Sequence, residues 1–133
     1  MACYNSIIPH ICPEIPADQR KALQQSLREP LVSTNVLIRN WVAFRKIGIF
    51  AAYCPGSYFS DIRLTYPLQF GDYQSARTPA EPITVKMYRI PVSGKGRAAD
   101  QFRAGRHELL ATTFETFERK IREQLGTMLA EGG

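Results

Sequence analysis

The stretch STNVLIRNWVAFRKIGIF, residues 33–50, changes its pattern part-way along. Its first half is rich in β-branched residues, so we predict a strand at residues 31–39, buried on both faces over residues 36–38. Asn40 suits a helix N-cap, and the following WVAFRKIG predicts about two helical turns that end at Gly48. A strand that leads straight into a short helix indicates a domain that mixes both kinds of element.

Three further segments predict strands. The apolar run at residues 49–53 is short and is followed by the turn signal CPGS. YFSDIRLTYP, residues 58–67, and ITVKMYRIP, residues 83–91, alternate apolar with polar side chains, which is the period of a strand with one wet face. Residues 67–82 carry Gly71, Asp72, Ser75, Pro79 and Pro82 and predict a long loop. We therefore expect an α+β fold with a mixed or antiparallel sheet of about four strands.

Two helices are predicted to cover this sheet. PADQRKALQQSLREP, residues 16–30, predicts a shorter N-terminal helix, with Pro16 in the first turn and Pro30 as its stop. After a flexible connector at residues 92–100, the C-terminal segment predicts a long amphipathic helix, because apolar residues recur at steps of three and four. The residues of this stripe are Leu110, Phe114, Phe117, Ile121, Leu125 and Met128.

Composition narrows the class of protein. The chain has 133 residues, enough for one domain, and 44% hydrophobic residues with 22% charged residues argue against disorder. The net charge of +5 comes from basic residues spread along the chain, so we expect no nucleic-acid partner. Cys3, Cys12 and Cys54 are odd in number and lack a C-x-x-C pair, which favours reduced thiols. The chain has no membrane-length apolar run and no signal-peptide pattern, so we expect no membrane partner and a cytoplasmic location.

Motif fragments leave no catalytic, cofactor-binding or metal-ligating residue to assign. GRHELLA begins like a zinc-binding H-E-x-x-H motif, but Ala111 stands where the second histidine belongs. SGKG lacks the first glycine and the final Ser or Thr of a phosphate-binding loop. No glycine-rich dinucleotide fingerprint and no G-x-S-x-G nucleophile elbow occurs.

Aromatic residues near the predicted strands are the remaining candidates for a site. Aromatic faces attract ammonium groups, so such residues can bind an organic cation, although alternating aromatics also serve as core. The candidate substrate-binding residues are Trp41, Tyr58, Asp61 and Tyr66.

Three collinear segments carry a family resemblance. They are MACYNSIIPHICPEIPADQRKAL, residues 1–23; PLVSTNVLIRNWVAFRKIGI with PGSYFSDIRLTYP and GDY, within residues 30–73; and RAGRHELLATTFETFERKIREQLGTML, residues 103–129. Together they resemble an interior portion of FAD-dependent amine oxidoreductases similar to spermidine dehydrogenase. That family resembles monoamine oxidase, in which a substrate domain is inserted between the two parts of an FAD-binding domain. The resemblance implies that residues 1–133 are such a substrate domain, with both FAD-binding lobes absent and no activity alone.

The resemblance leaves two versions open. In one, the chain is an excised domain without activity; in the other, it is one chain of a split enzyme whose flavin-binding partner chain holds the FAD. The alternative from another class is a stand-alone small-molecule-binding or protein-interaction module, monomeric or homo-oligomeric and without catalysis. Its polyamine-binding form is disfavoured because Asp61 and Asp72 are the only acids between Arg39 and Ala80.

Overall fold

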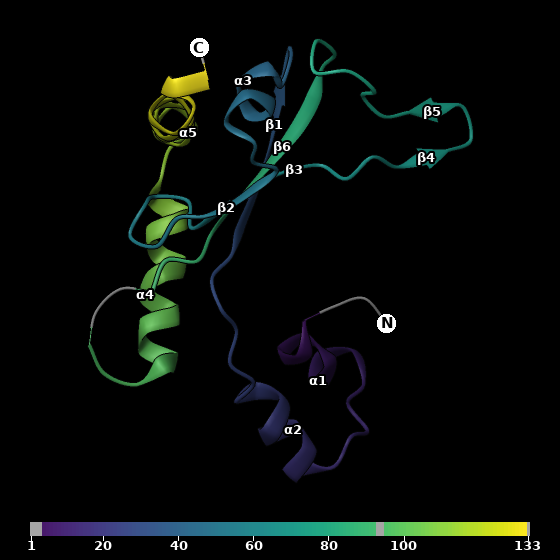
Figure 1. Ribbon diagram of the computed structural model, residues 1–133. Coiled ribbons are helices and arrows are strands. Elements are labelled where there is room, and N and C mark those ends of the chain that lie inside the picture. The colour runs from purple at the N-terminus through teal and green to yellow at the C-terminus, as the bar shows by residue number, and fades with distance from the viewer. Residues whose placement is uncertain (1–3, 93–94, 133) are drawn as a thin grey trace.

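The computed structural model describes residues 4–92 and 95–132 and has an α+β fold, as expected (Figure 1). A four-stranded sheet has the order β1-β6-β3-β2, and every pairing in it is antiparallel. Its strands are β1 (Val32–Ile38), β6 (Ile83–Arg89), β3 (Asp61–Leu64) and β2 (Ala51–Tyr53). Cys3 and residues 93–94 of the predicted connector lie outside the described residues.

One face of the sheet carries the core. Val85 of β6 is paired with Val36 of β1 on one side and with Leu64 of β3 on the other, and these side chains share the inner face. The buried core residues are Phe44, Phe59, Ile62, Leu64, Val85 and Met87. The prediction that β1 is buried on both faces is wrong, because Leu37 points to the other face and is 76% exposed. An alternating strand with one open face explains this pattern.

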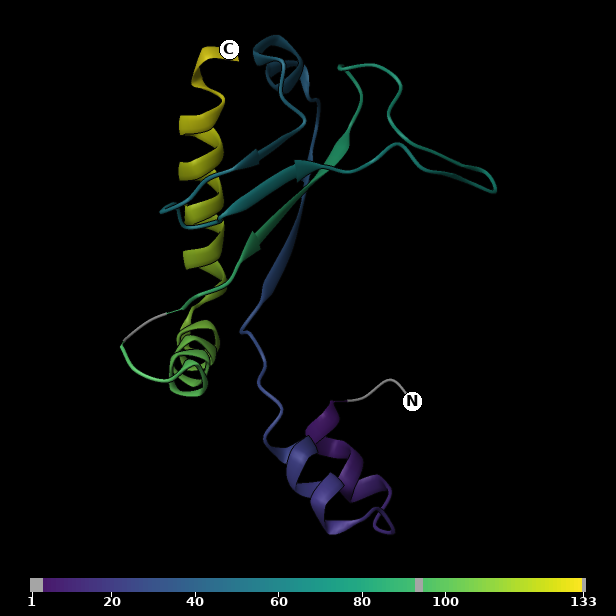
Figure 2. The same cartoon turned by 60° about the horizontal axis from the view of Figure 1, so that its bottom comes forward.

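The C-terminal segment forms two helices rather than one, and the second of them covers the inner face. The chain forms α4 (Ala98–Ala111) and α5 (Phe114–Met128), separated by two extended residues, Thr112 and Thr113. The hydroxyl of Thr113 accepts a hydrogen bond from the Thr116 amide at 3.3 Å and so caps α5. Figures 1 and 2 show the two helices running in different directions. The two stripe residues beside the break, Leu110 and Phe114, are therefore exposed rather than packed on the sheet.

α5 packs on the sheet through the rest of the predicted stripe. Phe117, Ile121, Leu125 and Met128 contact the buried core. The side-chain amide of Gln124 accepts from the Phe59 backbone N–H at 2.9 Å and donates to the Phe59 carbonyl at 2.8 Å. This double hydrogen bond satisfies the backbone of a buried loop residue and fixes the position of α5 along the sheet.

The predicted strand-to-helix change is confirmed. α3 (Val42–Ile47) follows β1, but its N-cap residue is Trp41 and not Asn40; the Asn40 side chain, one residue earlier, accepts a hydrogen bond from the Val42 amide at 3.3 Å. Gly48 ends α3 with φ of 73°, a left-handed conformation that favours glycine. The short helix η2 (Ala130–Gly132) packs against α3, so the end of the described chain closes over it.

The N-terminal helix forms, but it ends at Gln24 rather than at the predicted stop, Pro30, and it does not cover the sheet. η1 (Asn5–Ile7), α1 (Ile8–Ile11) and α2 (Ala17–Gln24) pack on one another and lie apart from the strands in both views (Figures 1 and 2). α2 has no buried residue, which is the expected result of its short apolar stripe. The chain after α2 is tied to α4 by a hydrogen bond of 3.0 Å from the Arg106 guanidinium to the Arg28 carbonyl.

The long loop predicted at residues 67–82 contains a small hairpin. β4 (Gln69–Phe70) and β5 (Tyr73–Gln74) pair around Gly71, which has φ of 56°. Residues 66–76, which we call the hairpin arm, project away from the main sheet (Figure 2). The arm is too short to bury its own apolar side chains, so Phe70 is 86% exposed.

β1 forms an open edge of the main sheet. Among the described residues, its backbone forms ladder hydrogen bonds with β6 alone. Charged residues and prolines usually prevent an edge strand from pairing further, and the strand VSTNVLI contains neither. Across residues 4–92 and 95–132, no helix is long and apolar enough to cross a membrane.

Candidate functional site

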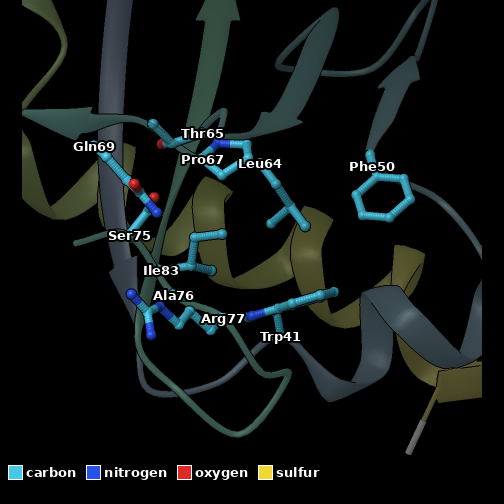
Figure 3. Close-up of a pocket in the computed structure, with 10 residues that line it drawn as sticks. All are labelled: Trp41, Phe50, Leu64, Thr65, Pro67, Gln69, Ser75, Ala76, Arg77 and Ile83. Carbon is cyan, nitrogen blue, oxygen red and sulfur yellow. The ribbon is translucent and has the colours of Figure 1, made fainter.

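A groove of about 380 Å³ lies between the start of α3, the ends of β3 and β6, and the base of the hairpin arm (Figure 3). Its apolar wall consists of Trp41, Phe50, Leu64 and Ile83. The backbone N–H of Trp41 donates to the Pro79 carbonyl at 2.8 Å, which ties the arm's return segment to the start of α3. Sequence positions 41 and 79 thus meet on one side of the groove.

Two aromatic rings shape the apolar wall. The Trp41 and Phe50 ring centroids are 6.3 Å apart and the rings are tilted by 50°. They flank α3, and the Gly48 turn allows the chain to reverse so that both reach the groove. The indole Nε1 of Trp41 is buried and has no hydrogen-bond partner among the described residues. Figure 3 shows this nitrogen on the side of Ile83 and Arg77.

The polar rim comes from the hairpin arm and its base. The Thr65 hydroxyl donates to the Thr84 carbonyl at 2.7 Å, and the Ser75 hydroxyl donates to the Leu68 carbonyl at 2.9 Å. Both hydroxyl protons are therefore used to hold the base of the arm. Within the described ranges, the side chains of Gln69 and Arg77 form no hydrogen bond or ion pair. They remain available to a ligand.

The backbone at Arg77 is held by Glu81. The Glu81 carboxylate accepts from the Arg77 N–H at 2.6 Å and from the Thr78 hydroxyl at 3.2 Å. The hydrogen bond from Arg77 is the main reason why the pKa of Glu81 is lowered from its ordinary value of 4.5. Because the carboxylate is turned to these donors, the loop presents the Arg77 side chain as the charged group of the groove.

The lining residues are suited to binding rather than to catalysis. Nucleophilic catalysis requires a base beside the nucleophile, and the groove lining contains no histidine, cysteine or carboxylate. Its free polar groups are mostly donors, namely the Trp41 N–H and the Arg77 guanidinium. The groove is therefore an apolar surface with hydrogen-bond donors at one side.

The four residues named from the sequence do not come together. Trp41 lines the groove, but Tyr58 lies at the opposite end of β3, stacked edge-on against Phe117 at 6.2 Å between centroids. Asp61 lies on the outer face of the sheet in an ion pair with Arg63. Tyr66 is 79% exposed on the hairpin arm and is not part of the groove lining.

Sequence reasoning missed Phe50, Gln69 and Arg77 as lining residues. Phe50 fell within the run predicted as a strand, and the other two fell within the predicted loop. No local pattern marks them, because their approach to Trp41 depends on the path of the hairpin arm.

The described residues do not fit the pyrophosphate of FAD, nor do they suggest a metal centre. The dinucleotide cradle is formed where a parallel βαβ unit turns into its helix, whereas every strand pairing in this sheet is antiparallel. Across residues 4–92 and 95–132, no three His, Cys, Asp or Glu side chains are grouped as ligands for a metal ion.

Comparison with known proteins adds no family assignment: no family model matches the sequence, and no curated protein does.

Proposed function

We propose that this chain is the substrate-domain part of an FAD-dependent amine oxidoreductase similar to spermidine dehydrogenase. In this proposal the FAD is held by flavin-binding lobes outside residues 1–133, and the chain is inactive without them. The sequence resemblance suggests this function, and the antiparallel sheet with its helical cover is compatible with an inserted substrate domain.

The observation that carries the proposal is the amount of exposed surface. The chain exposes 9661 Å², whereas a compact monomer of this mass exposes about 7,000 Å². The excess of about 2,600 Å² is about three times what one partner contributes to a standard interface. A chain with so much uncovered surface is expected to be completed by further protein.

The excess surface includes apolar side chains on parts that lack a neighbour. The hairpin arm exposes Tyr66, Leu68, Phe70 and Tyr73. The outer face of the main sheet exposes Leu37 and Tyr53, each at 76%. On the outer face Leu37 and Tyr53 lie on the two opposite edge strands, with Arg63 and Lys86 between them, so the contiguous exposed apolar area, which marks an interaction site, is that of the hairpin arm. We assign the arm to the contact with the flavin-binding lobes.

The chemistry divides between the two parts. FAD held in those lobes would supply the redox chemistry, and the protein around it would supply placement and electrostatics. The described residues form no cradle for FAD, so we place no step of the reaction on them.

The test combines the chain with each protein that is encoded by a neighbouring gene. We expect the chain and one of these proteins to co-purify with bound flavin and to reduce a dye when an amine is added. The variant Phe70→Ser should weaken co-purification, because it removes an exposed aromatic ring from the arm. Leu110→Ser, which changes an equally exposed residue of α4, is the matched control.

Two results would contradict the proposal. One is tight FAD binding by the purified chain alone, measured by quenching of flavin fluorescence. The other is a homodimer, seen by light scattering, whose interface occupies the hairpin arm and the outer sheet face.

A second candidate is a binding module without catalysis. The groove beside Trp41 favours it, because its free donors and apolar wall can select a small ligand without flavin.

A further inference from the structure

We propose that the groove beside Trp41 binds a small carboxylate with an aromatic or aliphatic body. Arg77 pairs with the carboxylate, the Trp41 N–H donates a hydrogen bond to it, and the apolar wall holds the body. This assignment is independent of the flavin-dependent function proposed above.

The apolar body is suited to the wall of the groove. Leu64 is 7% exposed and its side chain faces the groove, together with the partly buried Ile83 and the face of Trp41. The volume of about 380 Å³ lies at the lower end of the range of about 300–1,000 Å³ for ligand sites. A single ring or a short chain fits this space.

The head group is determined by the donors that lack partners. The buried Nε1–H of Trp41 is unsatisfied among the described residues, an unfavourable state that an acceptor on a ligand would relieve once the atoms that cover this nitrogen shift. The Arg77 guanidinium has no ion pair in the same residues and can bind a carboxylate through two parallel hydrogen bonds. The Gln69 amide can add a third donor.

The same groups disfavour an amine. An ammonium group needs acceptors, but the nearby Glu81 carboxylate is already hydrogen-bonded to the Arg77 amide and to Thr78. The Arg77 charge would also repel a cation in the groove. The groove is therefore suited to an acid and not to an amine.

The experiment compares two ligands that share one body. Trp41 is the single tryptophan of the chain, so its fluorescence reports on the groove directly. We expect 3-phenylpropionate to change this fluorescence saturably and to release measurable heat in calorimetry. We expect 3-phenylpropylamine, with the same ring and an ammonium group, to do neither at the same concentrations.

Two variants test the assigned contacts. Arg77→Gln should weaken phenylpropionate binding by about tenfold or more, since it removes a charged hydrogen-bond partner. Arg103→Gln, an exposed arginine of α4, should leave binding unchanged. Trp41→Phe keeps a ring but removes the N–H, and should weaken binding in calorimetry.

The inference is overturned if the amine binds as well as the acid. It is also overturned if Arg77→Gln binds phenylpropionate like the unchanged chain. Because the Arg77 side chain is exposed and supports no described contact, this variant is expected to fold, which circular dichroism checks. The result with Arg77→Gln therefore decides the question even if Trp41→Phe is unstable.

Discussion

At the residue scale, Gly105 shows how closely α4 approaches the rest of the chain. A Cβ atom at this position would lie 2.0 Å from the Pro91 carbonyl oxygen and 2.8 Å from the Pro30 ring. Backbone atoms cannot yield as a flexible side chain can, so a methyl group must displace α4. The glycine is needed here for space and not for an unusual backbone conformation.

We predict that Gly105→Ala lowers the free energy of unfolding by about 1–3 kcal/mol, measured by urea denaturation. Gly126→Ala in α5 is the matched control, because a Cβ there meets nothing within 4 Å. The control should be neutral or more stable by about 0.5–1 kcal/mol, since alanine favours a helix. Equal effects of the two substitutions would contradict the close approach at Gly105.

The lowered pKa of Glu81 predicts that the stability of the loop at Arg77 and Thr78 depends on pH. Its pKa is lowered in the folded chain, chiefly by the hydrogen bond from the Arg77 amide, so its contribution to stability is present above the ordinary value of 4.5. That contribution is lost as the pH falls through the lowered pKa. In an NMR titration below pH 4.5, the amide signals of Arg77 and Thr78 should shift together with the Glu81 carboxyl. In Glu81→Gln these amide shifts should disappear; their persistence would assign them to another group.

At the scale of elements, Arg89 holds α4 to the end of β6. Its guanidinium pairs with Glu108 of α4, donates to the Tyr58 carbonyl at 2.9 Å and lies 4.1 Å from the centre of the Tyr58 ring. The Arg89 side chain is only 19% exposed. A largely buried cation without its partner is unfavourable, so this ion pair matters more than those on the surface.

We predict that Glu108→Gln lowers the free energy of unfolding by about 1–2 kcal/mol, since it leaves the Arg89 charge without a counter-ion. Glu118→Gln is the control, because its partner Arg122 is 76% exposed. That substitution should change stability by less than about 0.5 kcal/mol. Thermal unfolding of both variants makes the comparison, and a smaller effect at Glu108 than at Glu118 would show that Arg89 is not held by this pair.

The sequence predicts elements well where the pattern is local. The alternation in β3 and β6 and the Asn40-to-Gly48 helix follow from side-chain period and end signals alone. The break between α4 and α5 was missed because Leu110 and Phe114 continue the apolar period across it, while the threonines between them provide the cap. The spacing of apolar residues shows which side of a helix is apolar, but here it did not show where one helix ends and the next begins.

The groove was beyond prediction for a different reason. Trp41 was named from the sequence, but its neighbour Arg77 reaches it only through the hydrogen bond between the Trp41 amide and the Pro79 carbonyl. Tyr58 was named with it because both are aromatic, yet the length of β3 separates them. Contacts between distant residues depend on the path of the whole chain, which no short pattern contains.

At the scale of the whole molecule, the described chain has a small core for its length. Six hydrophobic residues of the described chain are buried, five of them fully, and the hairpin arm and the N-terminal helices contribute none of the six. We therefore expect the arm and the N-terminal helices to exchange amide hydrogens faster than the main sheet. Hydrogen exchange measured by mass spectrometry checks this, and protection of the arm in the lone chain would mean that another contact covers it. Added flavin-binding partner should slow exchange in the arm.

The open edge of β1 has a consequence for the chain when it is prepared alone. An uncharged strand with free backbone groups is a template on which the same strand of another molecule can align, so concentrated solutions should become turbid with time. Asn35→Lys should delay this, because it places a charge in the middle of the template, whereas Gln19→Lys on α2 adds the same charge elsewhere and should not. Light scattering over days would follow the difference. The time for which the isolated chain stays in solution would then depend on the exposed backbone of β1.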